Sequence, residues 1–366
     1  MKKVLCIYIL WVVIINLFAI VAQNRFNLEH DTAYSWMQRE NFVAVHPWDP
    51  IQLHAHWDSF WYKDIATNGY SFQKLEFVSN IVFFPLYPLL TRLLAFLVGG
   101  NVVVAGIVLS TLSAALGLIY LFKLVKEFHP DINPYLPILF ILTFPTAFFL
   151  NVMYTESLFL FLSTACFYYG LRKNFITASV FGLFAALTRL TGFLLFIPIL
   201  WEYISYYGLK KPFNRSLFSL LLIPFGTFCF FLYHYFAFGD FFLFLKMEST
   251  FGRTFHIDQN DFLPTTHPAM VNFLIDCLFV VFALVTSFFA LTRLRISYGL
   301  YMLATIAIAL SSGKIMSIGR YILVLFPIYI LLASIKSEGV RYAYALLSTL
   351  LLSMYITLFV NGYWAG

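Results

Sequence analysis

The sequence predicts an all-α polytopic membrane protein, folded as one domain over residues 1–366. The chain is 61% hydrophobic and only 11% charged, which is too little charge to cover a surface exposed to water. Apolar runs of about 20 residues recur along almost its whole length, and an α-helix of that length crosses a bilayer. We therefore expect a bundle of about eleven transmembrane helices with no soluble domain attached.

The first expected helix covers residues 4–22 and follows Lys2 and Lys3. A signal peptide has a similar beginning, but this run is long and lacks a convincing small-residue cleavage site. We therefore predict a retained helix with a cytoplasmic N-terminus. It leads into residues 23–100, which we expect to be the first extracytoplasmic loop.

Residues 81–98 are apolar enough to cross the membrane, but the positions of the basic residues argue that they do not. If this segment crossed, most of the later basic loops would lie outside. If it lies in the interface instead, broken by Pro85 and Pro88, those loops all lie inside. We adopt the second topology and expect interfacial helices in the first loop. The remaining spans are then expected at 101–122, 135–150, 156–171, 174–188, 190–207, 216–238, 270–292, 296–311, 319–335 and 340–360.

The same topology places most carboxylates outside. The exceptions are Glu127, Asp131, Glu202 and Glu338. This distribution favours an extracytoplasmic active site, although long outer loops account for part of it. The net charge of +6 is explained by basic loops that set topology, so we expect no nucleic-acid partner. The four cysteines lie in apolar runs and show no metal-ligand spacing.

The densest group of polar and aromatic residues lies in the first loop, from His54 to Tyr70. We expect a helix over residues 51–67, in which Asp58 is surrounded by Trp57, Trp61 and Tyr62. A partly desolvated carboxylate is a suitable general base, and His54 would share its helix face. The alternative is an interfacial helix with an aromatic belt and solvated acids. We expect no metal site, because His54 and His56 would point to different sides of the helix.

Charged residues also mark the outer ends of later spans. Glu156 begins one span in very apolar surroundings, where a charge is costly unless it is paired or functional. Arg189 lies between two apolar runs and needs an anionic partner, for which Glu156 and a lipid phosphate are both candidates. Arg320 and the nearby Lys314 are candidate phosphate ligands, although basic side chains that reach out to the interface are common at such places. The loop at 239–269 is expected to be flexible and to face the substrate.

Several short motifs occur in a particular order along the chain. They are Trp57-Asp58-Ser59, Phe84-Pro85-Leu86-Tyr87-Pro88, Tyr154-Thr155-Glu156-Ser157, Arg189 and Gly319-Arg320-Tyr321. In these motifs the chain resembles the PIG-V-type mannosyltransferases, which are GPI mannosyltransferase 2-like members of the GT-C superfamily.

The resemblance implies a GT-C-like bundle in which Asp58 is the catalytic base of a hexosyltransferase. The donor would be a polyprenyl-phosphate sugar such as the mannose derivative, with no further cofactor, and the acceptor a glycolipid or glycan. An acceptor hydroxyl would attack with inversion, and Arg320, Arg189 or Lys314 would hold the leaving phosphate. Glu156 and Tyr321 belong to the matched motifs, and Trp57, Trp61 and Tyr62 would stack on sugar or line the donor groove.

The eukaryotic relatives act in the endoplasmic reticulum. The Met-Lys-Lys beginning of this chain is more similar to a prokaryotic member in the plasma membrane. Two other functions compete with this hypothesis. A transporter or flippase of lipid-linked sugars would place charges in the middle of its spans. A non-catalytic subunit of another transferase would not need Asp58.

Overall fold

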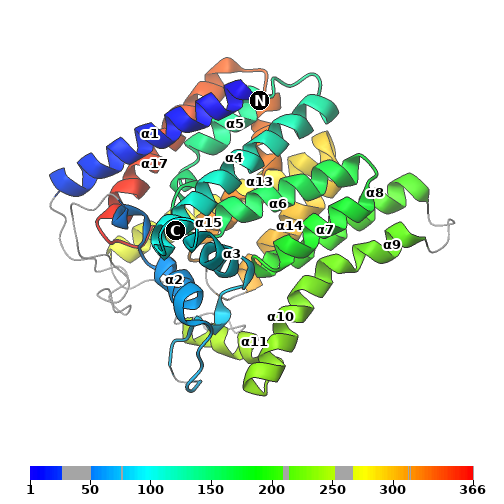
Figure 1. Cartoon of the computed structure of the whole chain (residues 1–366). Coiled ribbons are helices and arrows are strands. Elements are labelled where there is room, and N and C mark those ends of the chain that lie inside the picture. Colours follow the sequence, from blue (N-terminus) through cyan, green and yellow to red (C-terminus); the bar gives the residue numbers. More distant parts are fainter. Residues whose placement is uncertain are drawn as a thin grey trace.

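The computed structural model describes residues 1–26, 51–75, 77–208, 214–251, 267–311, 313 and 315–365. Within these ranges the chain forms helices and connecting turns without any β-strand, which confirms the all-α class (Figure 1). The first ten helices are α1 (Lys2–Arg25), η2 (Gln52–His54), α2 (Asp58–Asn68), η3 (Asn80–Val82), α3 (Leu86–Ala95), α4 (Val102–Phe128), α5 (Tyr135–Thr143), η4 (Ala147–Leu150), α6 (Glu156–Leu171) and α7 (Phe175–Ala186). They are followed by η5 (Leu190–Leu195), α8 (Phe196–Tyr207), α9 (Arg215–Leu220), α10 (Leu222–Phe238), α11 (Leu243–Glu248), η6 (Ser249–Phe251), α13 (His267–Phe289), η7 (Ala290–Leu294), α14 (Ile296–Ser311), α15 (Ile318–Leu323), α16 (Pro327–Ser334) and α17 (Glu338–Val360).

Six helical stretches in the described ranges are long and apolar enough to cross a membrane. They are Lys2–Arg25, Val102–Phe128, Leu190–Tyr207, Arg215–Phe238, Ala269–Leu294 and Glu338–Val360. All six coincide with spans expected from the sequence, so the polytopic membrane class is confirmed. The other expected spans are shorter or interrupted, and the total of about eleven remains a prediction.

Residues 81–98 contain no helix long enough to cross a membrane, and their interfacial position remains a prediction. This region forms the short turn η3 and the ten-residue helix α3. A helix of that length extends about 15 Å, roughly half the thickness of the hydrocarbon core. Pro85 directly precedes α3, so the break predicted at this proline is present. The break predicted at Pro88 is wrong: Pro88 lies in the first turn of α3, where a backbone N–H has no intrahelical partner in any case.

Two expected continuous spans are wrong. Residues 135–150 form α5 and the separate turn η4, divided at Phe144 and Pro145. Residues 319–335 form α15 and α16, and Pro327 is the first residue of α16. In both places proline removes a backbone donor and restricts the preceding residue, which ends a helix.

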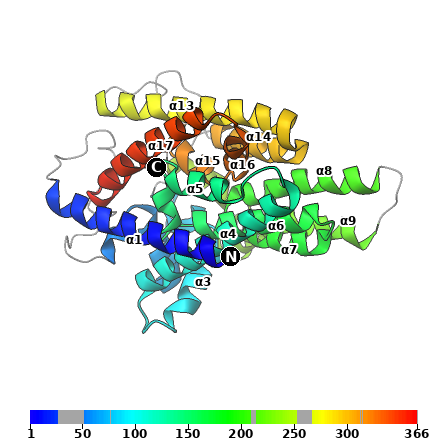
Figure 2. The same cartoon turned by 90° about the horizontal axis from the view of Figure 1, so that it is seen from above.

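The centre of the bundle consists of α4, α6, α7 and α10, each packed against the next. Figures 1 and 2 show α4, α6 and α7 side by side, with α13 and α3 on opposite sides of the bundle in Figure 2. Glycines allow close approach: a Cβ atom on Gly117 of α4 would lie 3.1 Å from the backbone nitrogen of Phe161 in α6. The turn from α6 to α7 and the C-terminal end of α8 lie at one end, and α2 and α11 lie at the other (Figure 1).

Candidate functional site

The predicted helix at 51–67 is wrong in its first half. Its N-terminal part is the short turn η2, and α2 begins only at Asp58. Trp57 has φ of 56°, a left-handed conformation that is costly for a bulky residue. His54 therefore does not share a helix face with Asp58. The Asp58 carboxylate instead belongs to the first turn of a helix, where the helix dipole stabilises negative charge.

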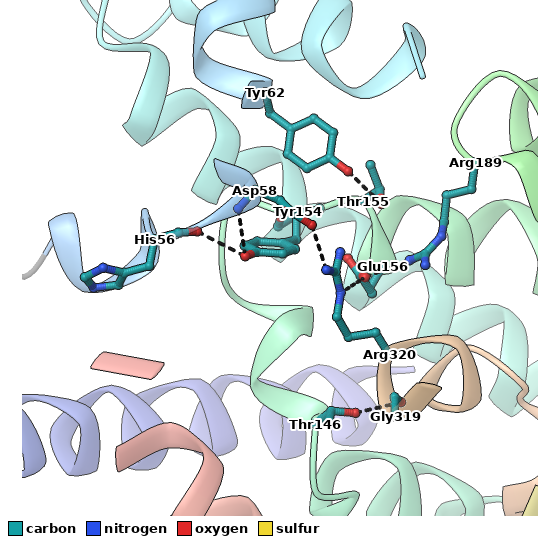
Figure 3. Close-up of polar contacts among 11 residues, drawn as sticks. His56, Asp58, Tyr62, Thr146, Tyr154, Thr155, Glu156, Arg189, Gly319 and Arg320 are labelled. Carbon is teal, nitrogen blue, oxygen red and sulfur yellow. Dashed lines mark hydrogen bonds and ion pairs between the residues drawn. The ribbon is translucent and has the colours of Figure 1, made fainter. Parts of the chain in front are cut away.

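Tertiary hydrogen bonds fix this backbone turn. The Tyr154 hydroxyl accepts a bond from the Asp58 backbone N–H at 3.2 Å and donates to the His56 carbonyl at 3.0 Å (Figure 3). The Met153 backbone N–H donates to the His54 carbonyl at 3.1 Å. The segment before α6 thus fixes the backbone of the residues before α2. Local sequence patterns alone do not reveal this tertiary contact.

Four charged side chains from distant parts of the sequence meet at this point (Figure 3). Arg320 Nη1 lies 2.7 Å from Asp58 Oδ2, and Arg320 Nε lies 2.8 Å from Glu156 Oε1. Arg189 Nη1 lies 2.7 Å from the same Glu156 oxygen. Glu156 is therefore the anionic partner that Arg189 was expected to need. We call Asp58, Glu156, Arg189 and Arg320 the charged cluster.

Burial separates the roles of the two carboxylates. The Glu156 side chain is 0% exposed, whereas the Asp58 side chain is 21% exposed. The guanidinium groups are nearly buried as well, at 6% for Arg320 and 10% for Arg189. A buried charge is stable only when it is paired, so the fully buried Glu156 carboxylate stabilises the two guanidinium groups. Asp58 is the carboxylate of this cluster that solvent reaches.

The charged cluster borders a large cavity of about 1400 Å³. Asp58, Arg189 and Arg320 line it directly. Much of its wall is aromatic, with phenylalanines supplied by α2, α10, α11 and the adjoining turns. These are Phe60, Phe77, Phe83, Phe84, Phe193, Phe228, Phe231, Phe241, Phe242, Phe244 and Phe251. The cavity thus combines an apolar wall with a compact charged region, an arrangement suited to an amphiphilic ligand.

The four predicted aromatic residues all line this cavity. The Trp57 indole donates to the Tyr363 carbonyl at 3.0 Å, and Trp61 stacks on Phe83 with ring centroids 5.9 Å apart. Burial raises the pKa of Tyr62, and its hydroxyl lies 3.5 Å from Thr155 Oγ1. The Arg189 guanidinium lies over the Tyr321 ring at 5.0 Å.

Some predictions fall outside the described residues. Lys314 is one of them, as are residues 252–266 of the expected substrate-facing loop. The part of that loop that is described forms α11 and η6, and Glu248 in α11 lines the cavity. Within the described ranges no group of three or more histidine, cysteine or acidic side chains is arranged to hold a metal ion.

Tyr154 and Asp64 are site residues that the sequence analysis does not predict. Tyr154 is fully buried, and its ring lies 4.6 Å below the Arg320 guanidinium. Asp64 lines the cavity two turns beyond Asp58 on α2. Tyr154 belongs to the Tyr-Thr-Glu-Ser motif, so the motif itself was the available signal. For Asp64 the signal was its place on the same helix as Asp58.

No family model matches the sequence, and no curated protein matches it. Among solved structures, ArnT from Cupriavidus metallidurans, bound to undecaprenyl phosphate, matches with a TM-score of 0.54 at 13% identity. The match covers 93% of this chain, which spans 62% of the ArnT chain. This similarity confirms a GT-C-like polytopic membrane fold. The PIG-V subtype remains a prediction from the sequence motifs.

Proposed function

We propose that this protein is an inverting glycosyltransferase that uses a polyprenyl-phosphate sugar as donor. The observation that carries the proposal is the charged cluster, in which one cavity-facing carboxylate is paired with an arginine beside an aromatic wall. A lipid-linked sugar phosphate has the three matching parts, namely an apolar chain, an anionic phosphate and a polar sugar. ArnT, whose fold is similar, was solved with undecaprenyl phosphate.

Asp58 is the base in this proposal. Its Oδ2 atom is held by Arg320, so the carboxylate is oriented while its other oxygen remains able to accept a proton. The acceptor hydroxyl loses its proton to Asp58, and its oxygen forms a bond to the anomeric carbon. The bond from that carbon to the phosphate oxygen breaks on the opposite face, so the configuration inverts.

Arg320 and Arg189 stabilise the leaving phosphate. The formal charges of the cluster sum to zero in the resting state, with two carboxylates and two guanidinium groups. When Asp58 takes the acceptor proton, one negative charge disappears and the cluster carries one excess positive charge. That charge arises at the moment when the polyprenyl phosphate gains negative charge, so it favours the transition state over the bound substrate.

The proposed sugar, acceptor and membrane face are taken from the resemblance of the sequence motifs to the PIG-V-type enzymes. We propose mannose as the transferred sugar, a glycolipid or glycan as the acceptor, and reaction on the extracytoplasmic face of a multi-pass membrane protein. Trp57, Trp61, Tyr62 and Tyr321 line the cavity and would contact the sugar or the first isoprene units. Lys314 is proposed as a further phosphate ligand on the sequence alone.

Purified protein in lipid nanodiscs tests the proposal. Radiolabelled polyprenyl-phosphate mannose is incubated with a membrane lipid extract, and the wild type is compared with Asp58→Asn. General-base catalysis contributes about 10²–10⁴-fold, so the variant should lose at least about 100-fold in rate. The product anomer should be opposite to that of the donor. Glu127→Gln is the control, because Glu127 forms a half-exposed ion pair with Arg172 at the other end of the bundle.

Equal rates for the wild type and Asp58→Asn would remove Asp58 as the base. Absence of transfer with mannose, followed by transfer with another polyprenyl-phosphate sugar, would correct the sugar. Absence of transfer with every such donor would contradict the enzyme function and favour transport of a lipid-linked sugar.

A further inference from the structure

A second set of polar and aromatic side chains lines the cavity along one stripe of α2. The stripe consists of Trp57, which caps the helix, Trp61, Asp64 and Asn68. The spacing of three and four residues places Trp61, Asp64 and Asn68 on one helix face, and Trp57, whose backbone is not helical, lines the same cavity just before the helix begins. The stripe therefore leads outward from the charged cluster, with aromatic rings first and a carboxylate and an amide beyond them.

The Asp64 carboxylate is held in a fixed orientation by two amides. Asn68 Nδ2 donates to Oδ1 at 2.8 Å, and Asn80 Nδ2 donates to Oδ2 at 2.7 Å. Asn80 is 1% exposed and is itself fixed, since it also donates to the Gly69 carbonyl and accepts from the Ser71 backbone N–H. A buried asparagine with all these bonds is a rigid support for the carboxylate.

The carboxylate retains capacity for a ligand. An ionised carboxylate offers about four lone-pair sites, and the two amides occupy one on each oxygen. The remaining sites are shared between the two oxygens of a side chain that lines the cavity, which suits a pair of adjacent hydroxyl groups. Hydrogen bonds from hydroxyl groups to a charged acceptor are stronger than bonds between neutral groups.

The chemistry of the stripe also excludes one class of ligand. Asp64 and Glu248 both line the cavity, as does Lys63, which precedes Asp64 on α2. An anionic group placed against the Asp64 carboxylate would meet like charge, which disfavours its binding. Aromatic rings next to hydrogen-bond acceptors suit the apolar face and the hydroxyl groups of a neutral sugar.

We infer that the α2 stripe binds the acceptor of the proposed transferase, and that the bound part of the acceptor is a neutral sugar or polyol. This inference rests on the proposed function. Asp64 lies six residues after Asp58, a rise of about 9 Å along the helix. The group held by Asp64 is therefore separate from the hydroxyl that Asp58 deprotonates, so the acceptor carries at least one further hydroxyl-bearing unit.

The test measures binding of sugars without turnover. Wild type, Asp64→Asn and the control Glu127→Gln are prepared in phosphatidylcholine nanodiscs, which contain no glycoside detergent. Methyl α-mannoside, α-mannobiose and a methyl glucuronide are titrated by saturation-transfer NMR. We expect the wild type and Glu127→Gln to bind the mannobiose more tightly than the monosaccharide and to bind the glucuronide least. Asp64→Asn should weaken mannobiose binding about tenfold or more, because it loses two charged acceptor sites.

Undecaprenyl phosphate is titrated in the same samples. Its affinity should be equal in the wild type and in Asp64→Asn, which also shows that the variant is folded. Mannobiose binding that is unchanged in Asp64→Asn, or absent from the wild type, would overturn the inference. These readouts do not need transfer, so failure of the transferase proposal alone would leave the Asp64-dependent binding in place.

Discussion

Glu156 is the buried centre of the charged cluster, and Glu156→Gln tests how much the cluster depends on its charge. The Oε1 atom of this side chain accepts from both Arg189 and Arg320 at 2.7 and 2.8 Å. The substitution keeps the size of the side chain and removes its negative charge. Two nearly buried guanidinium groups then face Asp58 alone, and the cluster carries one unpaired positive charge.

The size of the effect follows from burial. Removing one partner of a buried ion pair costs about 3–5 kcal/mol, because the remaining charge stays desolvated. Unfolding entropy of about 2.1 cal/mol/K per residue gives roughly 0.8 kcal/mol/K for a chain of 366 residues. We therefore expect the apparent Tm of Glu156→Gln to fall by roughly 4–7 °C.

Thermal unfolding in nanodiscs, followed by tryptophan fluorescence, measures this shift. The matched control is Glu127→Gln, which removes the same charge from an ion pair whose side chains are 40% and 52% exposed. Exposed pairs contribute about 0–1 kcal/mol, so the control should shift by about 1 °C or less. If both variants melt within 1 °C of the wild type, the ion pairs of Glu156 do not stabilise the fold and the reasoning fails.

Two further predictions concern the turn before α2. Tyr154→Phe leaves the Asp58 N–H and the His56 carbonyl without their common partner, so we expect a loss of about 2–4 kcal/mol in stability and slower transfer; an unchanged Tm and rate would refute this. Burial lowers the pKa of His54 from 6.5 to about 4, so the unfolded chain binds a proton at a higher pH than the folded chain does. The contribution of His54 to the free energy of unfolding is thus complete above pH 6.5 and is lost as the pH falls toward 4. At pH 5 this loss lowers the free energy of unfolding by about 2 kcal/mol. Melting curves at pH 7.5 and 5 should show a smaller drop in Tm for His54→Phe than for the wild type, and equal drops would contradict the assignment.

The sequence was sufficient to predict which charged residues are candidates for the site. Glu156, Arg189 and Arg320 are candidates because a charge at the end of an apolar run needs a partner or a function, and Asp58 because aromatic neighbours desolvate a carboxylate. The topology placed them at one end of the bundle, where the structure brings them together. Glu156 was a candidate partner of Arg189, but the ion pairs of Arg320 were not predictable, because Arg320 contacts residues 164 and 262 positions away in the chain.

The wrong helix boundaries have two kinds of cause, namely prolines within apolar runs and tertiary contacts. Helix breaks at Pro145 and Pro327 were visible in the sequence, but the apolar runs on both sides appeared continuous. The late beginning of α2 had no such signal. It depends on contacts with Met153 and Tyr154, which hold Trp57 in a conformation that few tryptophans adopt.

The break between α15 and α16 has a consequence for the assembly of the protein in the membrane. Helices of six and eight residues are each too short to insert alone, and the carbonyl groups at the break would be unsatisfied in lipid. The hydroxyl groups of Tyr329 and Tyr301 donate to the carbonyls of Leu323 and Val324 at 3.0 and 3.3 Å. Tyr301 belongs to α14, so the segment that carries Arg320 finds its backbone partners only after the preceding helix is in place. The end of the bundle that carries the charged cluster would therefore be completed late in biogenesis, when α14 enters the bilayer together with the segment that follows it.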